Sequence, residues 1–423
     1  PPPRTLSGGG IIRALTPSSN GLEKRPKLRF PGFDEPWEHK ELLHYLVENT
    51  DRNKQLKFGK ENVLSVSGEY GIVNQIAFQG RSFAGESVAD YHVVETDDIV
   101  YTKSPLKAKP YGIIKVNNGV PGIVSTLYAV YHPLKTVVPR FVDFYFSNDL
   151  RLNKFLKPLV NIGAKHDMKV NNTFVLTGMV VFPPLREQQK IVDFLTILDR
   201  RIDVQRKKVE ALKKYKRGVM QRIFRQLPSQ NGAEWTCVRL GDIFKKVSRR
   251  NTDGVIKNVI TNSAEYGLIP QRDFFDKVIA VDGNTANYYV IENGDFVYNP
   301  RKSNSAPYGP FNRYTLSEQG IISPLYTCLV LQADISPSYL AWYFKSDAWY
   351  RYIYDNGSQG VRHDRVSMTD DLLMGIPVMY PSHVKQLLYA DILDMVEARL
   401  QATQKTLELL SKTRDGYMRQ LFI

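Results

Sequence analysis

The feature that most constrains this chain is a stretch of 44 residues, 183–226, whose apolar residues recur in a heptad pattern. No proline interrupts it after Pro184, so it predicts one long helix with an apolar seam for a partner helix. Forty helical residues span roughly 60 Å, which is long for a core helix of a small domain. We therefore expect a spacer between two bodies. Its predicted seam contacts include Leu195, Leu198, Ile202, Val209 and Leu212.

The same pattern returns 198 residues later, in a second predicted helix at 383–423. The two polar positions of the first seam, Gln205 and Lys216, align with Thr403 and Arg414 of the second. An internal repeat of this length outranks any short motif as a guide to architecture. The seam contacts predicted in the second helix include Leu393, Val396, Leu400, Leu407 and Leu410.

A globular body precedes each predicted helix, and the two bodies match at anchor sequences with offsets of 196 to 198 residues. Short β-branched and aromatic runs between Gly, Pro and Asn predict α+β domains with mostly β centres, and one helix at 141–159. Matched anchors include Glu-Tyr-Gly at 69–71 and 265–267. A shared frame with different loops suggests two similar readers of different targets. The expected divisions are an irregular N-terminal segment at 1–26, a first body at 27–185, a helix at 186–226, a second body at 227–382 and a helix at 383–423.

The charge balance points to a polyanionic partner. The net charge is +14 and the isoelectric point is near 9.4, which favours nucleic-acid binding over a merely basic protein. Residues 186–225 hold 13 Lys and Arg against 5 Asp and Glu, and the second helix is nearly balanced. This excess is either a surface for an acidic partner or a solvated helix face.

The expected cellular compartment follows from two features of the sequence. Its two cysteines lie 91 residues apart, and it has no apolar run near 18 residues. A disulfide framework or a four-ligand zinc site is not expected, and neither is a membrane span. We expect a cytoplasmic protein without a bound metal.

The sequence offers little for catalysis. It has no Gly-x4-Gly-Lys-Ser/Thr phosphate loop, and Asn299-Pro300-Arg301 fails the Asn/Asp-Pro-Pro-aromatic pattern of adenine methyltransferases at its third residue. Glu38-His39-Lys40 resembles part of a nuclease site, but its place at a strand start favours an exposed strand edge. We therefore expect no catalytic residue.

Basic loops flanked by aromatic residues, 101–111 and 298–308, are the candidate DNA readers, with His-Asp pairs at 166–167 and 363–364. Arg and Lys suit guanine edges and Asn suits adenine, but the same side chains can hold only phosphates. A solvated loop is the alternative. The candidate DNA-binding residues are Lys103, Lys107, Lys109, Tyr111, Lys165, His166, Arg301, Lys302, Asn304, Tyr308, Arg362 and His363.

The stretch PPLREQQKIVDFLTILDRRI, closing with KRGVMQRIF, resembles the helical region of specificity subunits of type I restriction–modification enzymes. The opening KLRFPGFDEPW resembles the start of their first target-recognition domain, and the resemblance extends over residues 27–423. The second helix departs from the pattern, since Val384 stands where the first has Glu187.

This resemblance implies an α+β fold of two pseudo-repeated α/β target-recognition domains, separated by two long helices packed as an antiparallel coiled coil. It implies a non-catalytic DNA-binding subunit that reads a bipartite asymmetric site in double-stranded DNA. The implied partners are two methyltransferase (modification) subunits and, in the full complex, two motor-endonuclease (restriction) subunits. S-adenosylmethionine, ATP and Mg would be bound by those partners.

Two other hypotheses stay open. The chain could be an orphan DNA-recognition or protein-adaptor scaffold that is not coupled to methylation, or a self-contained nuclease or methyltransferase. The missing cofactor motifs count against the enzyme.

Overall fold

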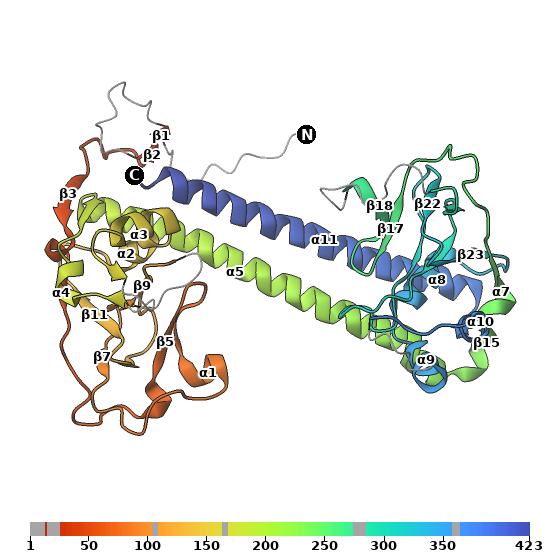
Figure 1. Ribbon diagram of the computed structural model, residues 1–423, viewed down its shortest axis with the longest axis horizontal. Coiled ribbons are helices and arrows are strands. Elements are labelled where there is room, and N and C mark those ends of the chain that lie inside the picture. The colour runs from red at the N-terminus through yellow and green to blue at the C-terminus, as the bar shows by residue number, and fades with distance from the viewer. Residues whose placement is uncertain (1–12, 15–25, 104–108, 163–167, 274–284, 358–363) are drawn as a thin grey trace. The chain divides into compact units, whose positions relative to one another are not determined.

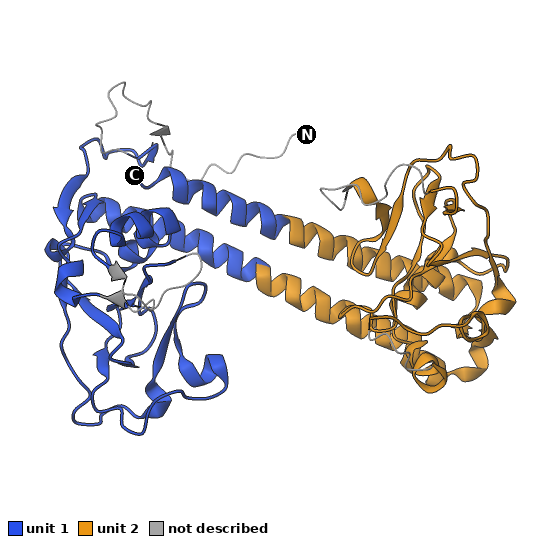
Figure 2. Ribbon diagram, viewed as in Figure 1, with its two compact units in different colours: residues 1–205, 406–423 blue, residues 206–405 orange. Residues whose placement is uncertain are grey.

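A computed structural model describes residues 13–14, 26–103, 109–162, 168–273, 285–357 and 364–423 (Figure 1). The chain divides into two compact units, shown in Figure 2. Unit 1 comprises residues 1–205 and 406–423, and unit 2 comprises residues 206–405. Each unit therefore contains a globular body and a segment of each long helix.

The centre of each body is a four-stranded antiparallel sheet with the same strand order. In unit 1 the order is β4 (Leu46–Glu48), β11 (Tyr128–Pro133), β8 (Ile99–Thr102), β9 (Ile113–Val116). In unit 2 it is β16 (Phe244–Lys246), β23 (Thr327–Leu331), β20 (Phe296–Tyr298), β21 (Phe311–Arg313). The inner strands β8 and β20 are buried throughout, as expected for strands covered on both faces. The sequence repeat is thus a repeat of fold.

Three antiparallel two-stranded ladders also recur in the two bodies. In unit 1 they are β5 (Leu64–Ser67) with β6 (Gly71–Asn74), β7 (His92–Val94) with β10 (Gly122–Val124), and β3 (Glu38–Glu41) with β14 (Met179–Phe182). In unit 2 they are β17 (Ile260–Ser263) with β18 (Gly267–Pro270), β19 (Tyr289–Ile291) with β22 (Gly320–Ile322), and β15 (Thr236–Arg239) with β24 (Pro377–Tyr380).

Short helices complete each body. Unit 1 has α2 (Pro139–Phe146), α3 (Asp149–Leu156) and α4 (Asn172–Val175), and unit 2 has α8 (Pro337–Lys345), α9 (Tyr350–Asn356) and α10 (Asp370–Met374). The single helix expected at 141–159 is wrong. Asn148 interrupts it, because its side chain accepts a hydrogen bond from the Arg151 backbone N–H and caps α3.

The long helices are α5 (Leu185–Gln221), continued by a π-helical turn at Arg222–Gln226, and α11 (His383–Gln420). Within unit 1 the segments run antiparallel, since the Phe194 ring contacts Tyr417 and Asp199 pairs with Arg414 at 3.0 Å. Within unit 2 they are again antiparallel, with Lys216 bound to Glu397 at 2.6 Å. The fold class predicted from the sequence is confirmed.

The predicted seam residues face the interior to different degrees. Six of them are buried: Leu195, Leu198, Ile202, Val209, Leu393 and Leu400. The other four are half-buried: Leu212, Val396, Leu407 and Leu410. Thr403, at one of the two polar positions, is buried as well.

A glutamine at the start of each long helix fastens it to its own body. Gln188 accepts a hydrogen bond from the Val138 N–H at 2.9 Å and donates to the Pro183 carbonyl. Gln386 accepts from the Ser336 N–H at 2.8 Å and donates in the equivalent way to Pro381. Both side chains are buried, so losing one would leave backbone groups unpaired.

A buried ion pair also fastens the first helix. Arg29, on the short strand β2 (Leu28–Arg29), donates two hydrogen bonds to Glu187 at 2.8 and 2.7 Å, and both side chains are buried. The glutamines Gln188 and Gln386 align at an offset of 198 residues, so Lys385 stands at the position of Glu187 in unit 2, and the expectation of Val384 there is wrong by one residue. Lys385 forms an exposed pair with Glu234. The two units therefore differ at this junction. The five divisions of the chain expected from the sequence stay a prediction.

None of the helices that the structure describes is long and apolar enough to cross a membrane.

Candidate nucleic-acid interface

Two tyrosines on the inner strands close the candidate reading loops. The Tyr101 hydroxyl donates to the Tyr111 carbonyl at 2.7 Å, and the Tyr298 hydroxyl donates to the Tyr308 carbonyl at 2.8 Å. Tyr101 and Tyr298 are almost fully buried, and burial raises the pKa of both phenols. Each loop thus leaves and re-enters its sheet at a fixed, hydrogen-bonded neck.

A glycine beside each neck lets the two chain segments touch. Gly112 and Gly309 have φ of +97° and +85°, a region that L side chains rarely adopt. A Cβ added there would lie 2.0 Å from the carbonyl oxygen of Thr102 or Asn299. Only glycine satisfies both conditions, so the shared Pro-Tyr-Gly anchor is a requirement of the loop neck.

In unit 2 the reading loop forms backbone contacts with Asp364 and Arg365, at the end of the predicted His-Asp motif. The Lys302 N–H donates to the Asp364 carbonyl at 2.9 Å, and Arg301 pairs with Arg365 in an isolated antiparallel bridge. The Arg301 side chain is exposed and that of Arg365 is 28% exposed. Two segments about 60 residues apart in the chain therefore place two guanidinium groups on one small area.

An aromatic residue completes this area. Burial raises the pKa of Tyr326, and the nearby Arg301 and Arg365 cations act in the opposite direction. We call Arg301, Arg365 and Tyr326 the unit 2 reading cluster. Sequence reasoning missed Arg365 and Tyr326, although Tyr326 belongs to a repeated Leu-Tyr match that aligns it with Tyr128. Basic groups beside an aromatic ring suit contact with a nucleic acid.

Lys103 of unit 1 lies within a network. Its ammonium donates to the Asn172 side chain at 3.0 Å, and Asn172 in turn donates to Glu48 at 2.9 Å. Burial lowers the pKa of Lys103, which the Glu48 carboxylate opposes and the Arg52 cation reinforces. The structure thus holds the Lys103 ammonium in one position near Arg52.

Arg52 itself is exposed and pairs with His92 in an isolated bridge, as Arg250 does with Tyr289 in unit 2. His92 is 2% exposed and its Nδ1 has no hydrogen-bond partner among the described residues. Burial lowers the pKa of His92 to about 4, with Arg52 and Lys103 adding to the effect. The imidazole is therefore neutral at pH 7, and Arg52 is a basic candidate that sequence reasoning missed.

Other predicted site residues have internal partners. Lys109 is 16% exposed and pairs with Asp149 at 2.9 Å, while Tyr111 and Tyr308 pack against the cores of their units. Asn304 is exposed and Lys302 is half-buried. Five of the predictions lie outside the described residues: Lys107, Lys165, His166, Arg362 and His363. The role of all these residues in DNA binding stays a prediction.

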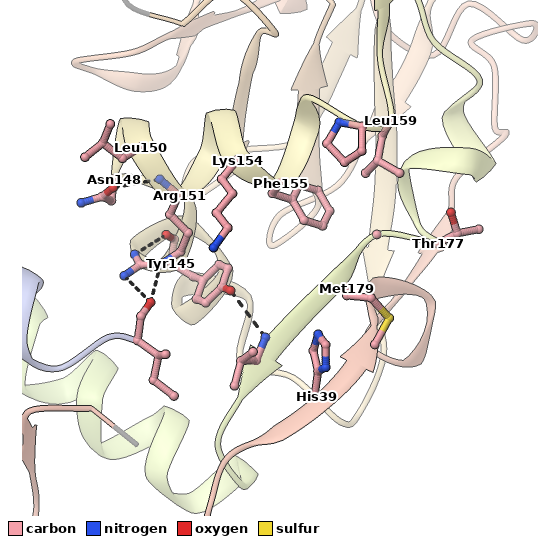
Figure 3. A pocket seen from close by; sticks show the side chains of 14 residues that line it. His39, Tyr145, Asn148, Leu150, Arg151, Lys154, Phe155, Leu159, Thr177 and Met179 are labelled. Atoms are coloured by element: carbon pink, nitrogen blue, oxygen red, sulfur yellow. Dashed lines mark hydrogen bonds between the residues drawn. The ribbon is translucent and has the colours of Figure 1, made fainter. Parts of the chain in front are cut away.

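Unit 1 contains a cavity of about 720 Å³ beside α3 and β14 (Figure 3). Arg151 at its edge donates to the carbonyls of Tyr145 and Ile423, and Lys154 and His39 line it too. Every charged or titratable side chain among its described lining residues is basic or a tyrosine. Those residues include no carboxylate–histidine or nucleophile–base arrangement.

The described residues contain no group of three or more His, Cys, Asp or Glu side chains placed to hold a metal. Of the segments considered for catalysis, Glu38-His39-Lys40 forms strand β3, and its Lys40 pairs with Glu38 at 2.7 Å.

Comparison with known proteins gives a consistent result. Residues 85–214, from the first body into α5, match the family model of the type I restriction modification DNA specificity domain. The S subunit of a type I restriction-modification system from M. genitalium has a similar fold, with a TM-score of 0.54 and 13% identity, over 94% of this chain and 99% of that one. No curated protein sequence matches the chain.

A second solved structure, described as showing complex assembly and conformational transition of the type I R-M system, gives a TM-score of 0.52. It is 16% identical and the match covers 92% of this chain and 98% of that one. At such identity these structures establish the fold alone. Residues 85–214 are thus similar to the type I restriction modification DNA specificity domain, and the chain has the fold of the S subunit from M. genitalium over nearly its whole length.

Proposed function

We propose that each unit reads one half of a bipartite, asymmetric site in double-stranded DNA. The observation that carries this proposal is the contrast within the repeat. The sheets, loop necks and loop-closing tyrosines are the same in both units, whereas the basic side chains near the loops differ. Unit 2 has Arg301 beside Arg365, whereas unit 1 has Lys103 in the corresponding loop. The bridge arginines Arg52 and Arg250 are common to both units. One frame with two donor sets suits two different half-sites.

The unit 2 reading cluster supports base or phosphate contact by its geometry. A guanidinium has five N–H donors in a planar fork, which matches the O6 and N7 edge of guanine or two phosphate oxygens. The bridge between Arg301 and Arg365 holds their backbones side by side. Such a contact contributes about 1 to 3 kcal/mol when it reads a base.

We propose further that the chain directs two methyltransferase subunits and two motor-endonuclease subunits to this site. S-adenosylmethionine, ATP and Mg belong to those partners in this proposal. Support comes from apolar side chains on the outer faces of the long helices. In unit 2, Leu388 and Met395 of α11 are 52% and 65% exposed, and in unit 1, Ile197 and Val204 of α5 are 55% and 53% exposed. Exposed apolar residues at heptad spacing suit docking of partner helices.

The test is sequencing of methylated DNA from cells that carry the system. Replacing Arg301 or Arg365 with Ala is expected to weaken one half-site by about 1 to 3 kcal/mol, which is roughly 5- to 150-fold in binding. The other half-site stays unchanged. A matched control is Arg351→Ala, since Arg351 is 78% exposed on α9 and pairs with Asp355.

Two results would count against this function. A chain that binds DNA without sequence preference is no specificity subunit, and a chain that purifies with partners unrelated to methylation is an adaptor. Equal loss at both half-sites from Arg301→Ala would show that the units do not read separately.

A further inference from the structure

The β5–β6 hairpin of unit 1 ends in a tightly fixed tip that displays an acidic and an aromatic residue. The Ser67 hydroxyl oxygen accepts hydrogen bonds from the backbone N–H groups of Glu69 at 3.3 Å and Tyr70 at 3.1 Å. Gly71, which begins β6, has φ of +75°. The Tyr70 ring is 61% exposed, and Glu69 is exposed as well.

The β17–β18 hairpin of unit 2 has the same tip. The Ser263 hydroxyl oxygen accepts from the N–H groups of Glu265 and Tyr266, both at 3.2 Å. Gly267 has φ of +76°, and Tyr266 is 59% exposed beside an exposed Glu265. The two tips thus agree in hydrogen bonding, backbone and exposure.

Folding alone explains only part of this agreement. A three-residue hairpin loop requires a residue that tolerates positive φ, which is the glycine, and it gains from the serine that satisfies two backbone donors. It requires neither an aromatic ring nor a carboxylate in the positions of Tyr70 and Glu69. The Tyr70 ring contacts the Phe78 ring, with the centroids 5.4 Å apart, but three-fifths of its surface stays in water, so it contributes little to a core.

Both tips lie next to the reading loops of their own units. In unit 1, a Cβ added to Gly68 would lie 3.8 Å from the Lys109 ammonium. In unit 2, Ala264 and Glu265 line one cavity with Ser305 and Ala306 of the reading loop. A molecule bound at a tip therefore lies within reach of the DNA-reading surface of that unit.

The kind of partner follows from comparing the two units: their hairpin tips are the same, but their reading loops differ. Different loops are expected of readers of two half-sites. A partner that meets both tips must present the same surface twice. The DNA backbone would do so, but each tip carries a glutamate, and a carboxylate close to phosphates is repelled. An identical protein subunit bound once to each unit meets both conditions.

We infer that the Glu-Tyr-Gly tips at 69–71 and 265–267 are two equivalent docking points for two copies of one methyltransferase subunit. Each copy offers an apolar recess for the tyrosine ring and a Lys or Arg for the glutamate. This inference rests on the proposed function. It adds, on each body, a second contact to the partner that docks on the long helices. A rigid, amphipathic tyrosine with two rotatable side-chain bonds is a frequent energetic anchor of protein interfaces.

The experiment uses the full chain co-expressed with its methyltransferase subunit, and counts subunits by native mass spectrometry. Wild type is expected to carry two copies. Tyr70→Ala and Tyr266→Ala are each expected to weaken one copy by about 30-fold or more, as loss of an anchor of about 2 kcal/mol implies, and the double variant weakens both. Glu69→Lys and Glu265→Lys act in the same direction. Tyr354→Ala is the control, since Tyr354 is 65% exposed on α9 and lies in no repeated tip.

The possible results separate the two ideas. If wild type binds no methyltransferase subunit, the proposed function fails and this inference fails with it. If wild type binds two copies and the double variant, folded by circular dichroism, still binds both with unchanged affinity, only the docking inference is overturned. Unchanged subunit binding together with weaker DNA binding would instead assign the tips to DNA.

Discussion

His92 is a buried imidazole with two cations nearby, and its protonation is therefore linked to folding. Burial, together with Arg52 and Lys103, lowers its pKa to about 4. An unfolded histidine has a pKa near 6.5, so between these values the unfolded chain binds a proton that the folded chain does not. Acid therefore favours unfolding through this residue, and its contribution to stability falls as the pH drops from about 6.5 to about 4.

The corresponding variant is His92→Gln, which does not titrate. We expect the difference in unfolding free energy between wild type and variant to change with pH by at most about 1.4 kcal/mol per pH unit, and to level off above pH 7. Urea unfolding at pH 7, 6 and 5 measures this difference. Stability curves that stay parallel across this range would contradict the linkage.

At the scale of the elements, the Arg29–Glu187 pair joins strand β2, at the start of the first body, to the start of α5. Both side chains are buried, so removing one leaves the other charge unpaired away from water. Glu187→Ala is expected to destabilise the protein by about 3 to 5 kcal/mol, whereas Arg29→Met with Glu187→Met together recovers most of that loss. Thermal and denaturant unfolding provide the measurement.

A control for that pair is Lys213→Ala, because Lys213 and Glu210 pair on the exposed face of α5. Exposed pairs contribute about 0 to 1 kcal/mol, so this variant stays close to wild type. A double Met variant as unstable as Glu187→Ala would mean that the ion pair itself, and not the unpaired charge, is decisive.

The long helices, the repeated bodies and the fold class could be predicted from the sequence, because heptad spacing and a constant offset are local or periodic signals. The reading site could be predicted only as two loops. Lys109 has its partner Asp149 40 residues away, and Lys103 has Asn172 69 residues away. No local pattern specifies such pairs, and the same holds for the meeting of Arg301 with Arg365.

At the scale of the whole chain, the repeat predicts that each body recognises its own DNA half-site independently of the other. Replacing residues 227–382 with the matching segment of a related specificity subunit is expected to change one half-site and keep the other, because each body has its own core. Methylated-site sequencing of the chimera gives the result. A folded chimera that loses both specificities would contradict independent readers.

The ion pairs of the two helices have a consequence for assembly. Asp199 of α5 aligns through the repeat with Glu397 of α11, and Lys216 aligns with Arg414. Each helix therefore carries an acid and, 17 positions later, a base, and each is self-complementary in an antiparallel pair. Two chains could exchange helices and keep every such contact. The covalent tether favours pairing within one chain, with an effective concentration of order millimolar for flexible linkers. Refolding at higher protein concentration is therefore expected to yield helix-swapped dimers, detectable by size-exclusion chromatography with light scattering.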